Sequence, residues 1–118
     1  MAIDVKRAYE TAATSDGCRI LVDRIWPRGI TKDDLQVDAW LKDLAPSTGL
    51  RKWFGHDPKK WDEFRRRYAK ELERRPGALE ELITRAKAGH VTLVFAAKDS
   101  EHNNAVALKQ QLELRLAR

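Results

Sequence analysis

The apolar residues of this chain form short, strand-like runs near its beginning and near residue 91. Residues 3–9 alternate roughly between apolar and polar side chains, which predicts a first strand. The run 19–25 contains Ile20, Leu21 and Val22 after the turn signal Asp16-Gly17, and it predicts a second strand. Residues 91–96 are apolar without polar alternation, as expected for a strand that is buried on both faces of a sheet.

Between and after these runs, the apolar residues follow helical spacing. A capping pattern at Thr31 predicts a short helix near 32–36, and residues 50–54 predict one or two helical turns that end at Gly55. Asp57-Pro58 is a helix start, and Pro76 separates the helix that follows from the next one, which ends at Gly89. The last helix is predicted to begin near Ser100. The apolar stripes of these three helices are Trp61, Phe64, Tyr68 and Leu72; Leu79, Leu82, Ile83 and Ala86; and Ala105, Leu108, Leu112 and Leu116.

This order of elements predicts an α/β fold, with a small and partly parallel sheet flanked by helices. Residues 37–44 fit a helix better than a strand, but both remain open. The chain shows no repeat and no linker, so we expect residues 1–118 to form a single domain with a core of its own.

The composition of the chain predicts where in the cell the protein is located. No apolar run approaches the roughly 18 residues of a membrane span, and the N-terminal residues lack the apolar region of a signal peptide. Cys18 is the only cysteine, so no disulfide can form within the chain. We therefore expect a cytoplasmic protein without a membrane association.

The formal net charge of +5 comes entirely from the middle of the chain. Residues 48–75 contain 10 Lys and Arg against 5 Asp and Glu, and the remainder holds 13 of each kind (23 − 10 and 18 − 5). A basic segment favours anionic partners, although a solvated helix face is the more common explanation for such a run. The residues of this segment that would contact nucleic acid are Arg51, Lys52, Arg65 and Arg66.

Two polar loops follow predicted strands, at 23–29 and 96–104. If the strands 19–25 and 91–96 are parallel neighbours, both loops lie at the carboxyl edge of the sheet, where α/β proteins bind ligands. Arginine and lysine side chains at this edge would bind a phosphate or a carboxylate. The candidate ligand-binding residues are Arg24, Arg28, Lys98, Asn103 and Trp26.

Four residues are candidates for proton transfer: Asp23, His56, Asp99 and His102. Each candidate also has a structural interpretation. Asp99 or Ser100 is the expected N-cap of the last helix, Arg24 could pair with Asp23 or Asp99, and the tryptophans are typical core residues. The three histidines and one cysteine show no metal-ligand spacing, and no cofactor motif occurs, so neither a metal nor a cofactor is expected.

Five sequence blocks stand out in order along the chain: RILVDRIWPRG (19–29), DAWLKDLAPS (38–47), LRKWFGHDP (50–58), WDEFRRRY (61–68) and AAKDSEHN (96–103). Together they resemble the YeaO-like proteins, which form domain-of-unknown-function family 488. The resemblance spans nearly the whole chain and implies a compact α/β domain in which residues 23–29, 56–57 and 98–103 belong together, but it implies no particular reaction.

The sequence thus supports three interpretations. The first is a pocket for a small anion at the strand ends, in an enzyme or in a binding protein. The second is a nucleic-acid-binding module that uses the basic segment 51–75. The third is a subunit that docks a protein partner through its last helix or its basic helix.

Overall fold

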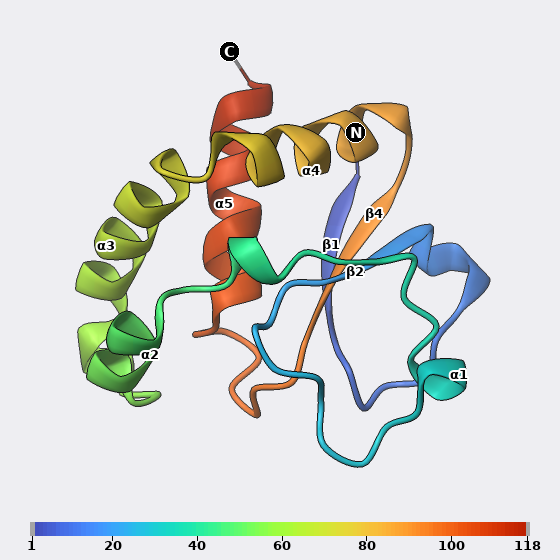
Figure 1. The fold of residues 1–118 in the computed structure, drawn as a ribbon, viewed down its shortest axis with the longest axis horizontal. Helices are drawn as coiled ribbons and strands as arrows, with labels where there is room; N and C mark the ends of the chain where they lie inside the picture. The colour runs from blue at the N-terminus through green and yellow to red at the C-terminus, as the bar shows by residue number, and fades with distance from the viewer. Residues whose placement is uncertain (1, 118) are drawn as a thin grey trace.

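Four parallel strands form one sheet in the computed structural model, which describes residues 2–117 (Figure 1). They are β1 (Ile3–Arg7), β2 (Cys18–Leu21), β3 (Ala39–Trp40) and β4 (Val91–Phe95), in the order β1-β4-β2-β3. β4 is the last strand of the chain, yet it lies between β1 and β2, and all five of its residues are buried. The predicted α/β class is confirmed, and the second and last strands, whose adjacency the sequence left open, pair in parallel.

Both N-terminal strands are shorter than predicted. β1 ends at Arg7 because Glu10 closes a turn there, with its N–H bonded to the Arg7 carbonyl oxygen at 3.0 Å. β2 ends at Leu21, and the last backbone bond to β4 is donated by Val22 to Val94 at 3.1 Å. Beyond this point the side chain of Asp23, rather than its backbone, continues the contact with the chain that leaves β4.

The two faces of the sheet carry different layers. Side chains alternate along each strand, so one face carries a large apolar cluster and the other a small one. The large cluster includes Ile20, Leu93 and Phe95 and is covered by helices. The small cluster joins Leu21 and Val94 to Leu35 of α1 (Lys32–Leu35).

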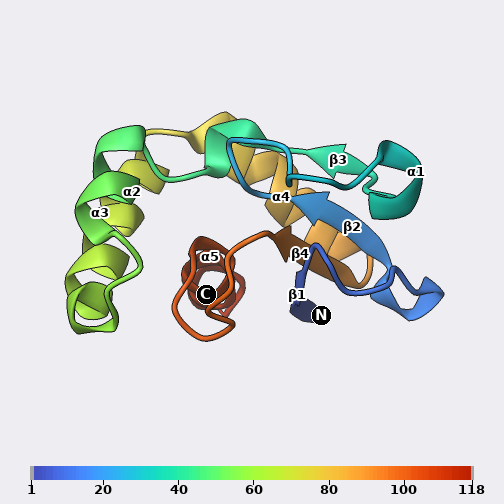
Figure 2. The same cartoon turned by 90° about the horizontal axis from the view of Figure 1, so that it is seen from below.

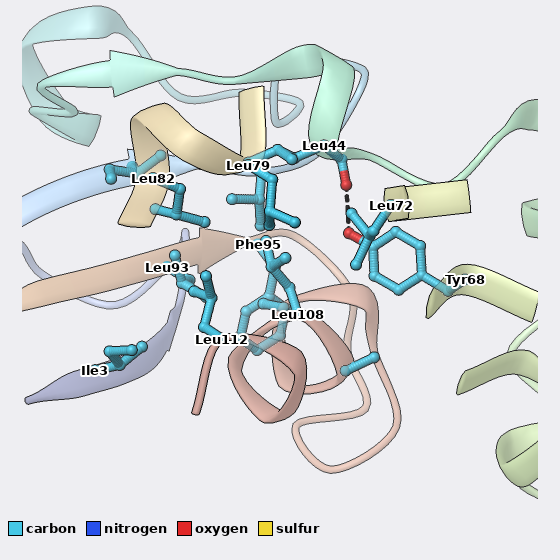
Figure 3. Close-up of a cluster of buried hydrophobic side chains, with 14 of the residues drawn as sticks. Ile3, Leu44, Tyr68, Leu72, Leu79, Leu82, Leu93, Phe95, Leu108 and Leu112 are labelled. Carbon is cyan, nitrogen blue, oxygen red and sulfur yellow. Dashed lines mark hydrogen bonds between the residues drawn. The ribbon is translucent and has the colours of Figure 1, made fainter. Parts of the chain in front are cut away.

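Four further helices complete the fold. They are α2 (Thr48–Phe54), α3 (Trp61–Glu73), α4 (Pro76–Ala88) and α5 (Asn104–Leu116). α5 packs against β1, β4 and α3, and it lies between the sheet and the α2–α3 pair (Figure 2). The buried side chains of α3, α4 and α5 meet over the sheet in one cluster, and the Tyr68 hydroxyl donates a hydrogen bond to the Leu44 carbonyl oxygen there (Figure 3).

Local signals fix most helix ends. Ser47 caps α2 by accepting the Leu50 N–H at 3.1 Å, and Gly55 ends it with a φ of 53°. Asp57 caps a 3₁₀ turn (Pro58–Lys60) that leads directly into α3. Residues 37–44, which the sequence left open, form the short strand β3 and then a 3₁₀ turn (Lys42–Leu44).

The predicted start of the last helix is wrong. α5 begins at Asn104 and its N-cap is Asn103, whose side-chain oxygen accepts the Val106 N–H at 2.9 Å. Asp99 and Ser100 lie in the preceding loop. Asp99 instead forms a separate turn, because its carboxylate accepts the N–H groups of Glu101 and His102 at 2.9 and 3.0 Å.

A buried ion pair joins Arg19 of β2 to Asp16. Arg19 is 3% exposed, and its Nη1 donates to Asp16 Oδ2 at 2.7 Å, while its Nε and Nη2 donate to the Leu35 carbonyl oxygen. Lys6 and the Ala13 N–H also bond to the Asp16 carboxylate. This network ties β1 and β2 to α1.

Among residues 2–117, no helix has the length and apolar character that crossing a membrane requires.

Candidate functional site

The carboxyl ends of β1, β2 and β4 open into a cavity of about 760 Å³, which we call the strand-end cavity. A cavity of this size falls within the range of small-molecule sites. Its walls come from the loop after β2, the loop after β4, and the facing helices α2 and α3. The lining residues are Tyr9, Asp23, Arg24, Ile25, Trp26, Pro27, Arg28, Ala45, Pro46, Arg51, Phe54, His56, Phe64, Ala96, Ala97, Lys98, Asp99, Asn103 and Asn104.

Asp23 lies where three elements meet. Its Oδ2 accepts the Ala96 N–H at 2.9 Å, and its Oδ1 accepts from Asn104 Nδ2 at 3.1 Å. Burial raises the pKa of Asp23, and the bonds from Ala96 and Asn104, with the charge of Arg51, oppose that rise only in part. The carboxylate therefore joins the end of β2 to the end of β4 and the start of α5. Each of its oxygens accepts one of these bonds.

Asp99 and His102 form a pair in the loop after β4. Asp99 Oδ2 lies 2.9 Å from His102 Nδ1, and Asp99 Oδ1 accepts two backbone N–H groups. The bond from the Glu101 N–H, followed by that from His102, lowers the pKa of Asp99. The His102 ring stands edge-on to Trp61 at 5.3 Å and does not line the strand-end cavity, whereas Asp99 does.

Asn103 and Trp26 line the cavity, but their polar groups serve the fold. Asn103 is buried, with its oxygen on the Val106 N–H and its nitrogen donating to the Asp99 carbonyl oxygen at 2.9 Å. Trp26 Nε1 donates to the Ile30 carbonyl oxygen at 2.7 Å, and its ring stands edge-on to Trp40 at 5.4 Å. Trp26 packs against the small cluster, in agreement with the core interpretation of the tryptophans.

Four basic side chains line the cavity and are exposed to solvent: Arg24, Arg28, Arg51 and Lys98. Within residues 2–117, none of the four forms a side-chain hydrogen bond or a salt bridge. The expected alternative, in which Arg24 pairs with Asp23 or Asp99, is therefore wrong. The acidic lining residues are Asp23 and Asp99, so the cations outnumber them by four to two.

His56 also lies on the cavity wall. It follows Gly55, and both residues have positive φ, 57° for His56, so the chain reverses sharply between α2 and the 3₁₀ turn. The His56 side chain is exposed, with its ring 6.3 Å from that of Phe54. Three of the four candidates for proton transfer, Asp23, His56 and Asp99, thus lie at the cavity, and His102 lies outside its lining.

The sequence reasoning missed several lining residues. Arg51 was considered only as a nucleic-acid contact, yet it reaches the cavity from α2 and acts on the pKa of Asp23. Tyr9 follows β1, which was not recognised as a neighbour of β4. Asn104 was placed in the loop without a role, although it bonds to Asp23. The one signal for Arg51 was the resemblance, because it groups residues 56–57, which follow α2, with the two loops.

The residues of the nucleic-acid alternative lie on two helices, α2 and α3. Arg65 bonds to Asp62 at 2.6 Å and to Gln110 at 3.2 Å, and Arg66 forms a salt bridge with Glu63. Lys52 is exposed on α2 and does not line the cavity. Much of the positive charge of α3 is thus balanced by acids one turn away.

Within residues 2–117, no three His, Cys, Asp or Glu side chains gather in a way that could hold a metal ion.

Comparison with known proteins identifies the relatives of this chain. A family model described as "Inactive DUF488-N3 subclade" matches residues 2–118. The chain belongs to the DUF488 family. The uncharacterized protein YeaO of Escherichia coli is 44% identical over 112 residues, which cover 95% of this chain and 97% of YeaO. The uncharacterized protein Rv3073c of Mycobacterium tuberculosis is 46% identical over 110 residues, 93% of this chain and 92% of that protein. No solved structure matches this DUF488 chain significantly.

Proposed function

We propose that this DUF488 protein binds a small anionic ligand in the strand-end cavity and does not transform it. The observation that carries the proposal is the set of four basic side chains, Arg24, Arg28, Arg51 and Lys98, around one cavity without an acidic partner among residues 2–117. Unpaired arginines at a concave site favour carboxylate or phosphate groups, which they bind through two parallel N–H donors.

Two observations favour binding over catalysis. The family model that matches the chain is described as an inactive subclade. The carboxylates at the site are also already engaged: Asp23 accepts from Ala96 and Asn104, and Asp99 accepts from two backbone N–H groups and lies against His102. These bonds give both carboxylates structural roles, at the strand ends and in the loop after β4. His56 is the candidate for proton transfer with the most accessible side chain, and within residues 2–117 its ring forms no hydrogen bond that would orient it.

The test is calorimetric titration of the purified chain with inorganic phosphate and with small organic phosphates and carboxylates. Arg28→Ala and Arg51→Ala should each weaken binding about 10- to 100-fold, because a charge-assisted hydrogen bond contributes roughly 1.5–3 kcal/mol. Their unfolding temperatures should stay within a degree or two of the parent, since neither side chain bonds within the described fold.

Lys52→Ala is the matched control. Lys52 is exposed and adjacent to Arg51 on α2, but it lies outside the cavity lining. It should leave binding within about twofold of the parent. Equal losses in Arg51→Ala and Lys52→Ala would indicate general attraction of anions to a basic protein, and the proposal would then be wrong. An absence of binding to any anion would also reject it.

The nucleic-acid alternative receives less support from the contacts. Its arginines Arg65 and Arg66 are paired with acids, and Trp61 is partly buried against Phe64 at 5.7 Å. Titration with a short oligonucleotide at two salt concentrations separates the two functions, since phosphate-backbone binding weakens steeply with salt.

A further inference from the structure

The strand-end cavity has aromatic side chains on both of its sides. Phe54 of α2 and Phe64 of α3 stack with their ring centroids 4.4 Å apart, and both line the cavity from the core, with only 5% and 2% of the two residues exposed. Trp26 and Tyr9 line it from the strand-end side. Tyr9 is 46% exposed, and the Arg7 guanidinium lies over its ring at 4.8 Å from the ring centroid, which leaves the other face of the ring for a bound molecule. The cavity therefore combines a cationic rim with aromatic surfaces.

The polar groups of these aromatic residues are already used within the protein. Tyr9 Oη donates to the Arg28 carbonyl oxygen at 2.9 Å, and the single N–H donor of Trp26 is bonded to Ile30. Phe54 and Phe64 have no polar group. The four rings thus offer only apolar surface to a ligand, and polar recognition falls to the unpaired arginines and Lys98.

The size of the cavity also favours a ligand that has an apolar body beside its anionic group. The cavity of about 760 Å³ is much larger than an inorganic phosphate or a short carboxylate needs. A ligand that filled it would place an anionic group near the basic side chains and an apolar body against the rings. A planar ring suits such walls best, because aromatic rings gain from offset-stacked and edge-to-face contacts beyond simple burial of area.

We propose that the ligand is an aromatic anion, a phosphate or carboxylate attached to a planar ring, and that Tyr9 is one of its ring contacts. This inference rests on the proposed function, since it names the class of anion that the cavity selects. The anionic group is held by Arg28, Arg51 and their basic neighbours, and the ring is held between Tyr9 and the Phe54–Phe64 wall.

The experiment compares anions with the same charged group and different bodies. Phenyl phosphate is titrated against ethyl phosphate, and benzoate against propionate, at one fixed ionic strength. We expect the ring-bearing member of at least one pair to bind about tenfold more tightly. The pair that shows the larger difference identifies phosphate or carboxylate as the preferred group. Equal affinity within both pairs would overturn the aromatic preference and leave the proposed anion site standing; no binding of any of the four would overturn both.

Two variants at position 9 test the ring contact. Tyr9→Leu keeps an apolar side chain and removes the ring, so the preference for phenyl phosphate over ethyl phosphate should fall to about threefold or less. Tyr9→Phe keeps the ring, loses only the bond to the Arg28 carbonyl oxygen, and should retain the preference. A Tyr9→Leu protein with the full preference would exclude Tyr9 as a ring contact. Because Tyr9 is half-exposed, both variants should fold.

Discussion

At the scale of single residues, the Arg19–Asp16 pair is the most demanding feature of the fold. Both side chains are nearly buried, and Arg19 supplies two donors to the Leu35 carbonyl oxygen as well as one to Asp16. Charges removed from water require this degree of satisfaction, since an unpaired buried charge is costly. The pair therefore stabilises the fold through its full set of hydrogen bonds more than through its charge alone.

Arg19→Met should destabilise the protein by about 3–5 kcal/mol, because it leaves Asp16 without its closest partner and the Leu35 carbonyl oxygen without donors. Urea unfolding at neutral pH measures the loss. Arg24→Met is the control: Arg24 is exposed and makes no bond within the described residues, so the change should stay within about 0.5 kcal/mol. A small effect of Arg19→Met would show that the network contributes little to stability.

Asp16 also predicts a dependence of stability on acid. Burial acts to raise the pKa of Asp16, but the Ala13 N–H, Lys6 and Arg19 outweigh it and hold the pKa below its ordinary value. Since the folded state binds this proton less tightly than the unfolded state, the stabilisation is present above about pH 4 and is lost as the pH falls through the folded pKa.

The corresponding measurement is urea unfolding from pH 7 down to pH 3 for the parent and for Asp16→Asn. The parent should lose more free energy of unfolding than the variant over this range, and the two curves should converge at the acidic end. Parallel curves would mean that Asp16 titrates alike in the folded and unfolded states. Other carboxylates contribute equally to both proteins and cancel in the difference.

At the scale of elements, helix ends were partly readable from the sequence. Ser47, Gly55 and Asp57 act as expected because a cap depends on one side chain and the backbone beside it. The start of α5 was not readable, because Asp99, Ser100 and Asn103 are all good cap residues and local chemistry does not choose among them. The choice follows from Asn104, whose side chain must reach Val22 and Asp23 across the sheet edge.

This assignment can be tested on α5 itself. Asn103→Ala should cost about 1–2 kcal/mol, because it removes the cap of the Val106 N–H and a bond to the Asp99 carbonyl oxygen. Ser100→Ala should cost a few tenths of a kcal/mol at most, since Ser100 is exposed and has no such role. Thermal unfolding of both variants decides the matter, and the reverse order of effects would restore Ser100 as the cap.

The strand lengths and the site show a second limit of local reasoning. The sequence brought the loops after β2 and β4 together only on the condition that the two strands are parallel neighbours, and the structure has that pairing. It did not place Tyr9 or Arg51 there, since β1 pairs with β4 across almost the whole chain and α2 reaches the cavity only through tertiary packing. No spacing along the chain encodes either contact.

At the scale of the whole molecule, the helices and the sheet share one large cluster of buried side chains. Trp53 and Trp61 pack against that cluster from α2 and α3, while Trp26 and Trp40 pack against the opposite face of the sheet. We therefore predict that unfolding is a single cooperative transition, as is usual for a domain of this size.

Urea unfolding followed by tryptophan fluorescence and by far-ultraviolet circular dichroism tests this prediction. In the parent, both signals should give the same midpoint. In a variant with Trp53 and Trp61 replaced by Phe, the remaining fluorescence reports from the sheet side alone, and it should again agree with the circular dichroism of that variant. Separate midpoints would show that the α2–α3 pair unfolds independently of the sheet, and that residues 1–118 contain more than one cooperative unit.

The position of β4 has a consequence for how the chain folds during its synthesis on the ribosome. The central strand of the sheet is the last strand to be made: Ile3 pairs with Val91 and Cys18 with the same residue. At a synthesis rate of about 5–20 residues per second, β1 is synthesised roughly 4–18 s before its partner strand. During that interval the apolar faces of β1 and β2 have no strand between them. The nascent chain thus waits for its last quarter before the sheet, and with it the strand-end cavity, can form.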